Sequence, residues 1–282
     1  MTRILHLSDT HFGTVKPALR QALLRMAHET RPDVLVLSGD VTQRAQVGQF
    51  REAKAFCDEL AIPRMLAIPG NHDISLGNPF KRFFNPYGDY RRAFGHDLEP
   101  VLQVPGLCVI GVRTTRRFRH KNGQVSSAQI NRVASRLREV PAGELRIVVV
   151  HQPVHAVRAE DAHDGLRNRE AAVRAWADAG ADIVLGGHIH LPYVADLSES
   201  GASHGDVRRR LWCVQAGTAL SSRVRWEAPN SVNLINHQPG DAFCEVGRWD
   251  YRLAVPGDAG YSADAPSGAF MQAEVRQLAL DR

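Results

Sequence analysis

Five short, mainly apolar runs in this chain of 282 residues lead into glycine, aspartate, asparagine or histidine. Asparagine and histidine are poor strand formers, and glycine marks a sharp turn or a close approach of the backbone. Where the carboxyl ends of parallel strands meet at one edge of a sheet, the loops that follow them form one site. We therefore expect a single site built from these five endings. They are 4–7 with Ser8-Asp9-Thr10-His11, 34–37 with Ser38-Gly39-Asp40, 65–68 with Gly70-Asn71-His72-Asp73, 147–150 with His151, and 183–185 with Gly186-Gly187-His188-Ile189-His190.

The order of the expected elements indicates a parallel sheet with crossover helices in the first part of the chain. Apolar residues recur there at the spacings of strands and of amphipathic helices in alternation. After residue 190 the pattern changes to strands alone. We expect helices from Pro17 up to Pro32 and over 45–60, 127–139 and 169–179, and strands over 3–7, 33–38, 64–68, 101–104, 107–112, 145–150, 182–185, 192–196, 211–215, 231–236 and 242–252.

Local signals mark the ends of two of these helices. Ser126 with Gln129 three positions later matches a capping box before helix 127–139. Asn168 is expected to cap the helix that follows it, and Gly180 is expected to end that helix.

Residues 74–100 interrupt the alternation with a cluster of aromatic and basic residues. Aromatic side chains among Lys and Arg are typical of a nucleic-acid platform, but we favour a helical excursion that packs its rings inward. Residues 256–268 are rich in glycine, proline, alanine and serine and predict a linker. We therefore expect one domain over 1–255, followed by a linker and a short C-terminal element over 256–282. The aromatic residues of the cluster are Phe80, Phe83, Phe84, Tyr87, Tyr90 and Phe94.

Composition and charge indicate a soluble protein with a basic surface. A formal net charge of +5 favours anionic partners such as phosphate compounds, nucleic acid or an acidic membrane surface. The four cysteines are far apart, which predicts reduced thiols and a cytoplasmic location. The first strand begins near the N-terminus, so we expect no cleavable signal peptide, and no apolar stretch approaches membrane-spanning length.

Carboxylate, imidazole and amide side chains dominate the five strand endings. Together they suit a borderline divalent metal, and neither a calcium site nor a thiolate zinc site. Seven ligands exceed what one tetrahedral ion accepts and match two ions that share a bridging group. The candidate ligands are Asp9, His11, Asp40, Asn71, His151, His188 and His190.

The chain resembles the calcineurin-like metallophosphoesterases in five blocks of the same order and similar spacing. The resemblance implies an α/β fold, a four-layer α-β-β-α sandwich of two mixed sheets. It implies two divalent ions, for which Mn²⁺, Fe²⁺ and Zn²⁺ all suit the ligands. The first ion would be held by Asp9, His11 and His190, the second by Asn71, His151 and His188, and Asp40 would bridge them. The blocks are Asp9-x-His11, Gly39-Asp40, Gly70-Asn71-His72, His151 and Gly187-His188-Ile189-His190.

The same resemblance implies hydrolysis of a phosphodiester by attack of a metal-bound hydroxide. His72 would reach the leaving-group oxygen without being a ligand, as a general acid or charge stabiliser. The protein-phosphatase branch has Gly-Asp-x-x-Asp-Arg-Gly, whose second Asp orients the catalytic histidine. Here Gln43 occupies that place and cannot form a charge pair with an imidazolium, which argues against a phosphoprotein phosphatase. The compact length and the block from Gly187 to His190 look more like the bacterial cyclic-nucleotide phosphodiesterases.

Two basic segments could contribute to substrate binding. Arg113 and the arginines that follow it come after a strand end and could form a phosphate-binding rim, although a solvated loop is an equal alternative. The segment from Ser221 to Arg225 follows Gly217 and could border the site.

Four functions remain open on the sequence alone. The favoured one is a dimetal phosphodiesterase for a small phosphodiester, with a 3′,5′-cyclic nucleotide as the first candidate. A pyrophosphatase for a lipid-linked nucleotide, of the UDP-diacylglucosamine type, would use residues 80–94 as a membrane-facing lid. A DNA exonuclease would bind with a steep salt dependence. A non-catalytic scaffold is least favoured, because the full ligand set is present. The sequence does not indicate an oligomeric state.

Overall fold

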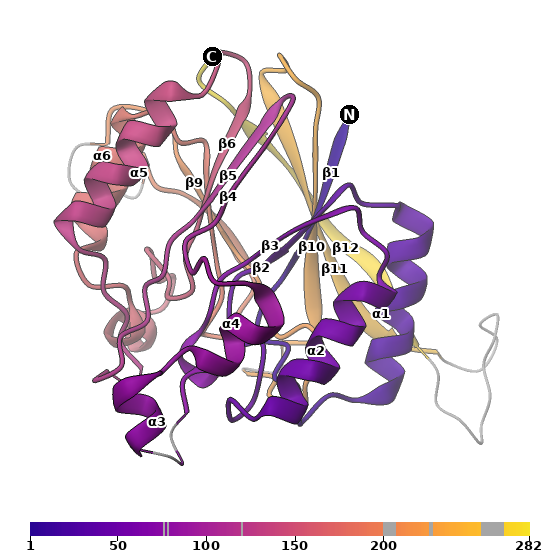
Figure 1. Cartoon of the computed structure of the whole chain (residues 1–282). Coiled ribbons are helices and arrows are strands. Elements are labelled where there is room, and N and C mark those ends of the chain that lie inside the picture. Colours follow the sequence, from indigo (N-terminus) through magenta and orange to yellow (C-terminus); the bar gives the residue numbers. More distant parts are fainter. Residues whose placement is uncertain (76, 78, 120, 200–206, 226–227, 255–267) are drawn as a thin grey trace.

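The computed structural model describes residues 1–282 except 76, 78, 120, 200–206, 226–227 and 255–267. Two six-stranded sheets pack face to face, and helices cover their outer faces. Figure 1 shows α1 (Pro17–Thr30) and α2 (Val47–Glu59) on one side and α5 (Ser127–Glu139) and α6 (Arg169–Asp178) on the other. This is the four-layer α-β-β-α sandwich of two mixed sheets that the resemblance implied. No helix in the described ranges is long and apolar enough to span a bilayer.

The first sheet is centred on the N-terminal strand and has the order β12-β11-β10-β1-β2-β3. β1, β2 and β3 run parallel to one another, so their carboxyl ends meet at one edge. β10, β11 and β12 extend the sheet in antiparallel pairs. The strands are β1 (Thr2–Leu7), β2 (Val34–Leu37), β3 (Arg64–Ala67), β10 (Ser231–His237), β11 (Phe243–Leu253) and β12 (Gly268–Ala279).

The second sheet has the order β4-β5-β6-β7-β9-β8. Its four inner strands are parallel, and both edge strands are antiparallel to their neighbours. The strands are β4 (Val101–Val104), β5 (Leu107–Gly111), β6 (Leu145–Val149), β7 (Ile183–Gly186), β8 (Tyr193–Asp196) and β9 (Trp212–Gln215). The helices and strands with predicted bounds lie within two residues of those bounds.

Three apolar cores follow from the alternation of side chains along the strands. In β1, Ile4 points into the layer between the two sheets, whereas Leu5 and Leu7 point towards α1 and α2. The layer between the sheets also holds Val36 and Ile147. A third core lies between the second sheet and α5 and α6. The layers hold the ends of β1, β2, β3, β6 and β7 in fixed positions, which is the requirement for a site built from their loops.

The segment 74–100 forms two short helices, α3 (Pro79–Phe84) and α4 (Gly88–Phe94). Tyr87 and Tyr90 are buried, as expected for rings that pack inward. The prediction is wrong for Phe80, Phe83 and Phe84, whose exposed fractions are 77%, 47% and 76%. α3 is only six residues long and buries none of its side chains, so it has no inner face to receive them.

The prediction that Asn168 caps α6 is wrong. Its side chain makes no cap, because the residue adopts a left-handed backbone (φ 66°) and its amide donates to the carbonyl of Val125 at 2.8 Å. The linker expected over 256–268 lies, apart from Gly268, outside the described residues. The C-terminal element is a strand of twelve residues, β12, that forms an edge of the first sheet and buries Phe270 and Leu278.

The capping box before α5 is confirmed, and it gives a direct test of this fold. Ser126 Oγ accepts from the N–H of Gln129 at 3.2 Å, and Gln129 Oε1 accepts from the N–H of Ser126 at 3.0 Å. We expect Ser126→Ala to lower the free energy of unfolding by about 1 kcal/mol, measured by urea titration. Ser127→Ala, at the exposed next position, is the matched control. Equal destabilisation by the two variants would contradict the cap.

Candidate metal centre

The five polar loops predicted from the sequence lie together at the carboxyl ends of the parallel strands. β1, β2 and β3 lead into them from the first sheet, and β6 and β7 from the second. Within each sheet the backbone joins them: Asp9 N–H donates to Gly39 O at 3.1 Å, and Gly187 N–H donates to His151 O at 3.0 Å. Between the sheets, His188 N–H donates to Oδ2 of Asp9 at 2.9 Å. The fold therefore brings the seven predicted ligands to one place.

Asp9, His11 and His190 form a first group, whose ligand atoms all lie within 4.8 Å of one another. Oδ1 of Asp9 is 3.2 Å from Nε2 of His190 and 3.7 Å from Nε2 of His11. The two imidazole nitrogens are 3.3 Å apart. Two nitrogens and one carboxylate oxygen that converge in this way suit a borderline divalent ion.

Asp40, His151 and His188 form a second group within the same 4.8 Å limit. Nε2 of His151 is 3.2 Å from Oδ1 of Asp40 and 3.0 Å from Oδ1 of Asn71. The amide oxygen of Asn71 therefore faces the same point as the ligands of this group. The division into two sets is the one that the resemblance implied.

The carboxylate of Asp40 lies between the two groups. Its Oδ1 faces His151 of the second group, and its Oδ2 is 3.9 Å from Nε2 of His11 in the first. A carboxylate with one oxygen on each side can bridge two cations and reduce their mutual repulsion. Oδ1 also accepts the N–H of His72 at 2.8 Å, which fixes the orientation of the carboxylate.

Backbone carbonyls orient two of the imidazole rings. Nδ1 of His151 donates to the carbonyl of Ser38 at 2.8 Å, and Nδ1 of His190 donates to the carbonyl of Arg223 at 2.5 Å. Each carbonyl can only accept, so it assigns a proton to Nδ1 and turns Nε2 towards the ligand group. Around metal-bound histidines, hydrogen bonds of this kind fix the tautomer and the orientation of the ring.

Burial and charge set the protonation of the ligands. Burial lowers the pKa of His11 and of His188 to about 3, so both rings are neutral and have a lone pair to offer. Burial also disfavours a charge on His151, but Asp40 outweighs it and raises the pKa of His151 to about 9. Burial likewise opposes the charge on Asp40, yet His151 holds its pKa well below the usual range. A cation bound here would replace the proton on His151.

Several ligands adopt a backbone that L-residues rarely adopt. Positive φ angles occur at Asp9 (52°), His11 (45°), Asp40 (48°), His188 (74°) and His190 (60°). Each such residue costs of order 1 kcal/mol, and such residues collect at functional sites. These five backbone conformations direct the side chains towards a common centre and lower the local stability.

Asp73 ties the loop after β2 to the loop after β3. Its carboxylate accepts the N–H groups of Val41 (3.1 Å), Thr42 (2.8 Å) and Gly70 (2.9 Å) and the hydroxyl of Thr42 (2.8 Å). Burial and the nearby charge of Asp40 still raise the pKa of Asp73 to about 6. Asp73 belongs to the segment Gly70-Asn71-His72-Asp73, but no role for it was predicted from the sequence.

The surroundings of His72 differ from the expectation based on the side chain of Gln43. Nδ1 of His72 donates to the backbone carbonyl of Gln43 at 2.9 Å, a contact that any residue at position 43 could make. The Gln43 side chain instead accepts from Nη1 of Arg223 at 3.4 Å. The same Nη1 lies 3.1 Å from Nε2 of His72.

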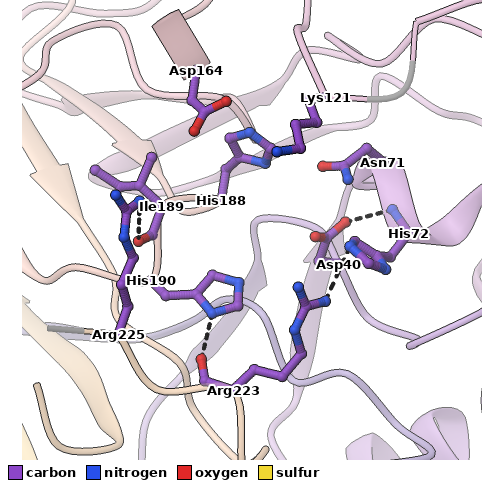
Figure 2. Close-up of a pocket in the computed structure, with 10 residues that line it drawn as sticks. All are labelled: Asp40, Asn71, His72, Lys121, Asp164, His188, Ile189, His190, Arg223 and Arg225. Atoms are coloured by element: carbon purple, nitrogen blue, oxygen red, sulfur yellow. Dashed lines mark hydrogen bonds between the residues drawn. The ribbon is translucent and has the colours of Figure 1, made fainter. Parts of the chain in front are cut away.

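A cavity of about 280 Å³ opens over the two groups (Figure 2). Arg113 does not line it; its guanidinium lies over the ring of Tyr87, 5.5 Å from the centroid. Arg223 and Arg225 do line it, as the position of residues 221–225 suggested. Lys121 and Asp164 were not identified from the sequence, because nothing in their local pattern marks them. The lining residues are Asp40, Asn71, His72, Lys121, Asp164, His188, Ile189, His190, Arg223 and Arg225.

Two buried ligand atoms test whether these residues fit metal ions. Among the described residues, Asp9 Oδ1 and His188 Nδ1 are buried and make no hydrogen bond. A buried polar atom without a partner costs about 1–3 kcal/mol, and a bound cation would provide a partner for it. Together with the shared carboxylate of Asp40, this fits the two divalent ions implied by the resemblance.

The sequence model of the calcineurin-like phosphoesterase family matches residues 2–192. The chain belongs to this family. The assignment confirms the class of enzyme expected from the sequence, a metal-dependent phosphoesterase, and divalent metal ions are implied by it. A probable cyclic nucleotide phosphodiesterase of Rhodococcus erythropolis is 27% identical over 209 residues, which cover 69% of this chain and 67% of that protein.

Solved structures share the fold of this phosphoesterase. Purple acid phosphatase PPD1 from yellow lupin (Lupinus luteus) matches with a TM-score of 0.66 and 11% identity over 88% of this chain. The match spans only 51% of the lupin chain. A dimetal phosphatase from Danio rerio matches with a TM-score of 0.58 and 12% identity over 99% of both chains. At these identities the likeness shows the fold alone.

Replacing the shared carboxylate should reduce metal binding. In Asp40→Asn the oxygen that accepts the His72 N–H can remain, but the negative charge between the two groups is lost. We expect the phosphoesterase to retain its fold and to bind fewer than two Mn²⁺ ions, measured by elemental analysis after equilibrium dialysis and by isothermal titration calorimetry. Asp58→Asn, at an exposed ion pair on α2, is the control. Two ions bound with unchanged affinity in Asp40→Asn would contradict the bridge.

Close packing of two loops should make Gly187 irreplaceable. A Cβ at Gly187 would lie 1.8 Å from Oγ of Ser8 and 2.5 Å from Oδ2 of Asp9, so the loops would have to separate. We expect Gly187→Ala to abolish the rise in melting temperature that Mn²⁺ gives the wild type. Gly48→Ala is the matched control, because a Cβ there meets nothing within 4 Å. The prediction fails if both variants respond to Mn²⁺ like the wild type.

Proposed function

We propose that the protein is a dimetal phosphodiesterase that hydrolyses a small phosphodiester. The observation that carries the proposal is the carboxylate of Asp40, whose two oxygens face two separate groups of metal-ligating side chains. When bound, two divalent ions would supply Lewis-acid activation of water and neutralise the charge of a phosphate. The first group would be Asp9, His11 and His190, and the second Asn71, His151 and His188, with Asp40 common to both.

The other groups of the cavity would bind and orient the ester. The ring of His72 borders the cavity; its Nδ1 donates to Gln43 O, and its Nε2 lies 3.1 Å from Nη1 of Arg223. The amide of Asn71 is held by His151. Buried strand ends form the floor of the site, which limits the access of bulk water and strengthens the electrostatic interactions there.

The shape of the site favours a diester over a monoester. A second cavity, of about 570 Å³, adjoins the first, and His72 lines both. A phosphodiester has two organic substituents, and two cavities that share His72 as a lining residue could hold one each. The second cavity contains Arg44 and Lys81, which would favour an anionic or polar substituent such as that of a nucleotide.

A 3′,5′-cyclic nucleotide is the first substrate that we propose. The similarity to a probable cyclic nucleotide phosphodiesterase supports it, as does the net charge of +5. The preferred metal among Mn²⁺, Fe²⁺ and Zn²⁺ would follow from availability, since all three suit these ligands. A cytoplasmic location would suit the four cysteines, which are buried and unpaired.

One surface feature favours a second candidate, a pyrophosphatase for a lipid-linked nucleotide. Phe80, Phe83, Phe84 and Phe118 are 47–77% exposed and form what we term the phenylalanine patch. Phe83 contacts Phe84 and Phe118, and Arg117 lies over the rings of Phe83 and Phe118 at 5.0 and 4.6 Å. Exposed aromatic rings beside a cation suit an acyl chain or an anionic membrane surface.

Substrate preference decides between these functions. We expect protein reloaded with Mn²⁺ after chelation to hydrolyse bis-p-nitrophenyl phosphate with a higher kcat/KM than p-nitrophenyl phosphate. Asp40→Asn should lose the activity and Asp58→Asn should keep it. Cyclic nucleotides, an acylated nucleotide diphosphate in detergent and single-stranded DNA are then compared.

Each outcome has a definite meaning. Preference for p-nitrophenyl phosphate would overturn the phosphodiesterase proposal. Turnover of the acylated substrate alone would favour the second candidate, and DNA cleavage that falls steeply with salt would favour an exonuclease. Absence of turnover with every substrate, from protein that binds two ions, would contradict an enzymatic function for these esters.

A further inference from the structure

Arg223 stands out among the groups around the cavity. It lies in the connection between β9 and β10, its side chain is half-buried, and it reaches over the cavity towards His72 and Asp40 (Figure 2). Its backbone carbonyl accepts from Nδ1 of His190. One residue therefore orients a predicted metal ligand through its backbone and presents a cation to the cavity through its side chain.

The guanidinium of Arg223 has only neutral partners in the described part of the chain. Nη1 donates to Oε1 of Gln43 (3.4 Å) and lies 3.1 Å from Nε2 of His72, which accepts because its Nδ1 carries the proton. Nη2 and Nε make no hydrogen bond with the described residues. Arg225, which lines the same cavity, is paired with the buried carboxylate of Asp161 at 2.5 Å.

The positive charge of Arg223 is thus held next to the metal groups with two donor nitrogens, Nη2 and Nε, available. A guanidinium presents its N–H groups in a planar fork that matches the oxygens of a phosphate. The groups that hold Nη1 are an amide oxygen and an imidazole nitrogen, which position it without neutralising it. An acidic residue at position 43 would instead form an ion pair with it.

We propose that Arg223 is a substrate-binding residue that contacts a non-bridging oxygen of the phosphate, and that Gln43 keeps its charge available for that contact. The inference deepens the proposed function and rests on it for the identity of the ester. Because the Arg223–Nε2 contact occupies the lone pair of His72, Arg223 is the cation that would face developing negative charge on the phosphate. Gln43, which has no charge, would then position the guanidinium of Arg223 without neutralising it.

Binding of inorganic phosphate tests this inference without turnover. Isothermal titration calorimetry on Mn²⁺-loaded protein should give a Kd that rises about 10- to 100-fold in Arg223→Gln, as expected for a lost charged hydrogen bond. Arg223→Lys keeps the charge but not the fork, and we expect an intermediate Kd. Metal stoichiometry should be unchanged, because His190 is held by the backbone at position 223.

The isosteric variant Gln43→Glu provides an independent test of the role of Gln43. Its carboxylate would pair with Arg223 and should weaken phosphate binding to a similar extent. The double variant Gln43→Glu with Arg223→Gln should then show less than the sum of the two effects in free energy. Arg20→Gln, which removes an arginine from a surface ion pair on α1, is the matched control and should leave the Kd unchanged.

The results separate this inference from the proposed function. A Kd for phosphate within twofold of the wild type in Arg223→Gln, with two ions bound, would overturn the inference even if the diester is hydrolysed. Wild-type protein that binds phosphate through Arg223 yet hydrolyses no phosphodiester would overturn the proposed function and support the inference. Additive effects in the double variant would refute the coupling to Gln43, as would tight phosphate binding by Gln43→Glu.

Discussion

The site depends on one carboxylate placed between two sets of ligands. Asp40 can take this position because β2 ends between β1 and β3 and its loop turns back through a positive φ angle. Its oxygens then face His11 on one side and His151 on the other, while the N–H of His72 fixes the plane. A site for two cations close together requires a shared anion of this kind. The chemistry of the site therefore depends directly on the strand order.

This arrangement of ligands requires the loops that carry them to pack very closely. Loops from the two sheets approach until a methyl group at Gly187 would overlap Ser8, and within the first sheet a methyl group at Gly70 would overlap Asp40. Asp73 offsets part of the local cost by accepting four hydrogen bonds, and the rigid apolar layers hold the strand ends in place. The strained left-handed conformations at Asp9 and four other ligands are tolerated because the surrounding structure leaves no alternative.

Sequence reasoning located the strands and the seven ligands because they follow from strand periodicity and from polar residues at strand ends, whereas the arrangement in two sheets came from the family resemblance. It failed where the answer depends on a backbone atom or on tertiary position. The partner of His72 is the carbonyl of Gln43, and a sequence displays side chains only. Lys121 and Asp164 line the cavity because of their place in the folded chain, and the exposure of Phe80 reflects a helix too short to have an inner face. Neither is a property of local pattern.

The origin of the ligands has a mechanical consequence. Asp9, His11, Asp40 and Asn71 follow strands of the first sheet, whereas His151, His188 and His190 follow strands of the second; both ligand groups therefore draw on both halves of the sandwich. Ions bound there would cross-link the halves at their rim, much as a disulfide joins two segments. The interior between the sheets is held mainly by apolar contacts, with a few hydrogen bonds such as that from Asn233 Nδ2 to Gln215 O at 3.2 Å. Sliding of one sheet over the other would alter both coordination spheres at once, which couples the rigidity of the whole sandwich to the geometry of its centre.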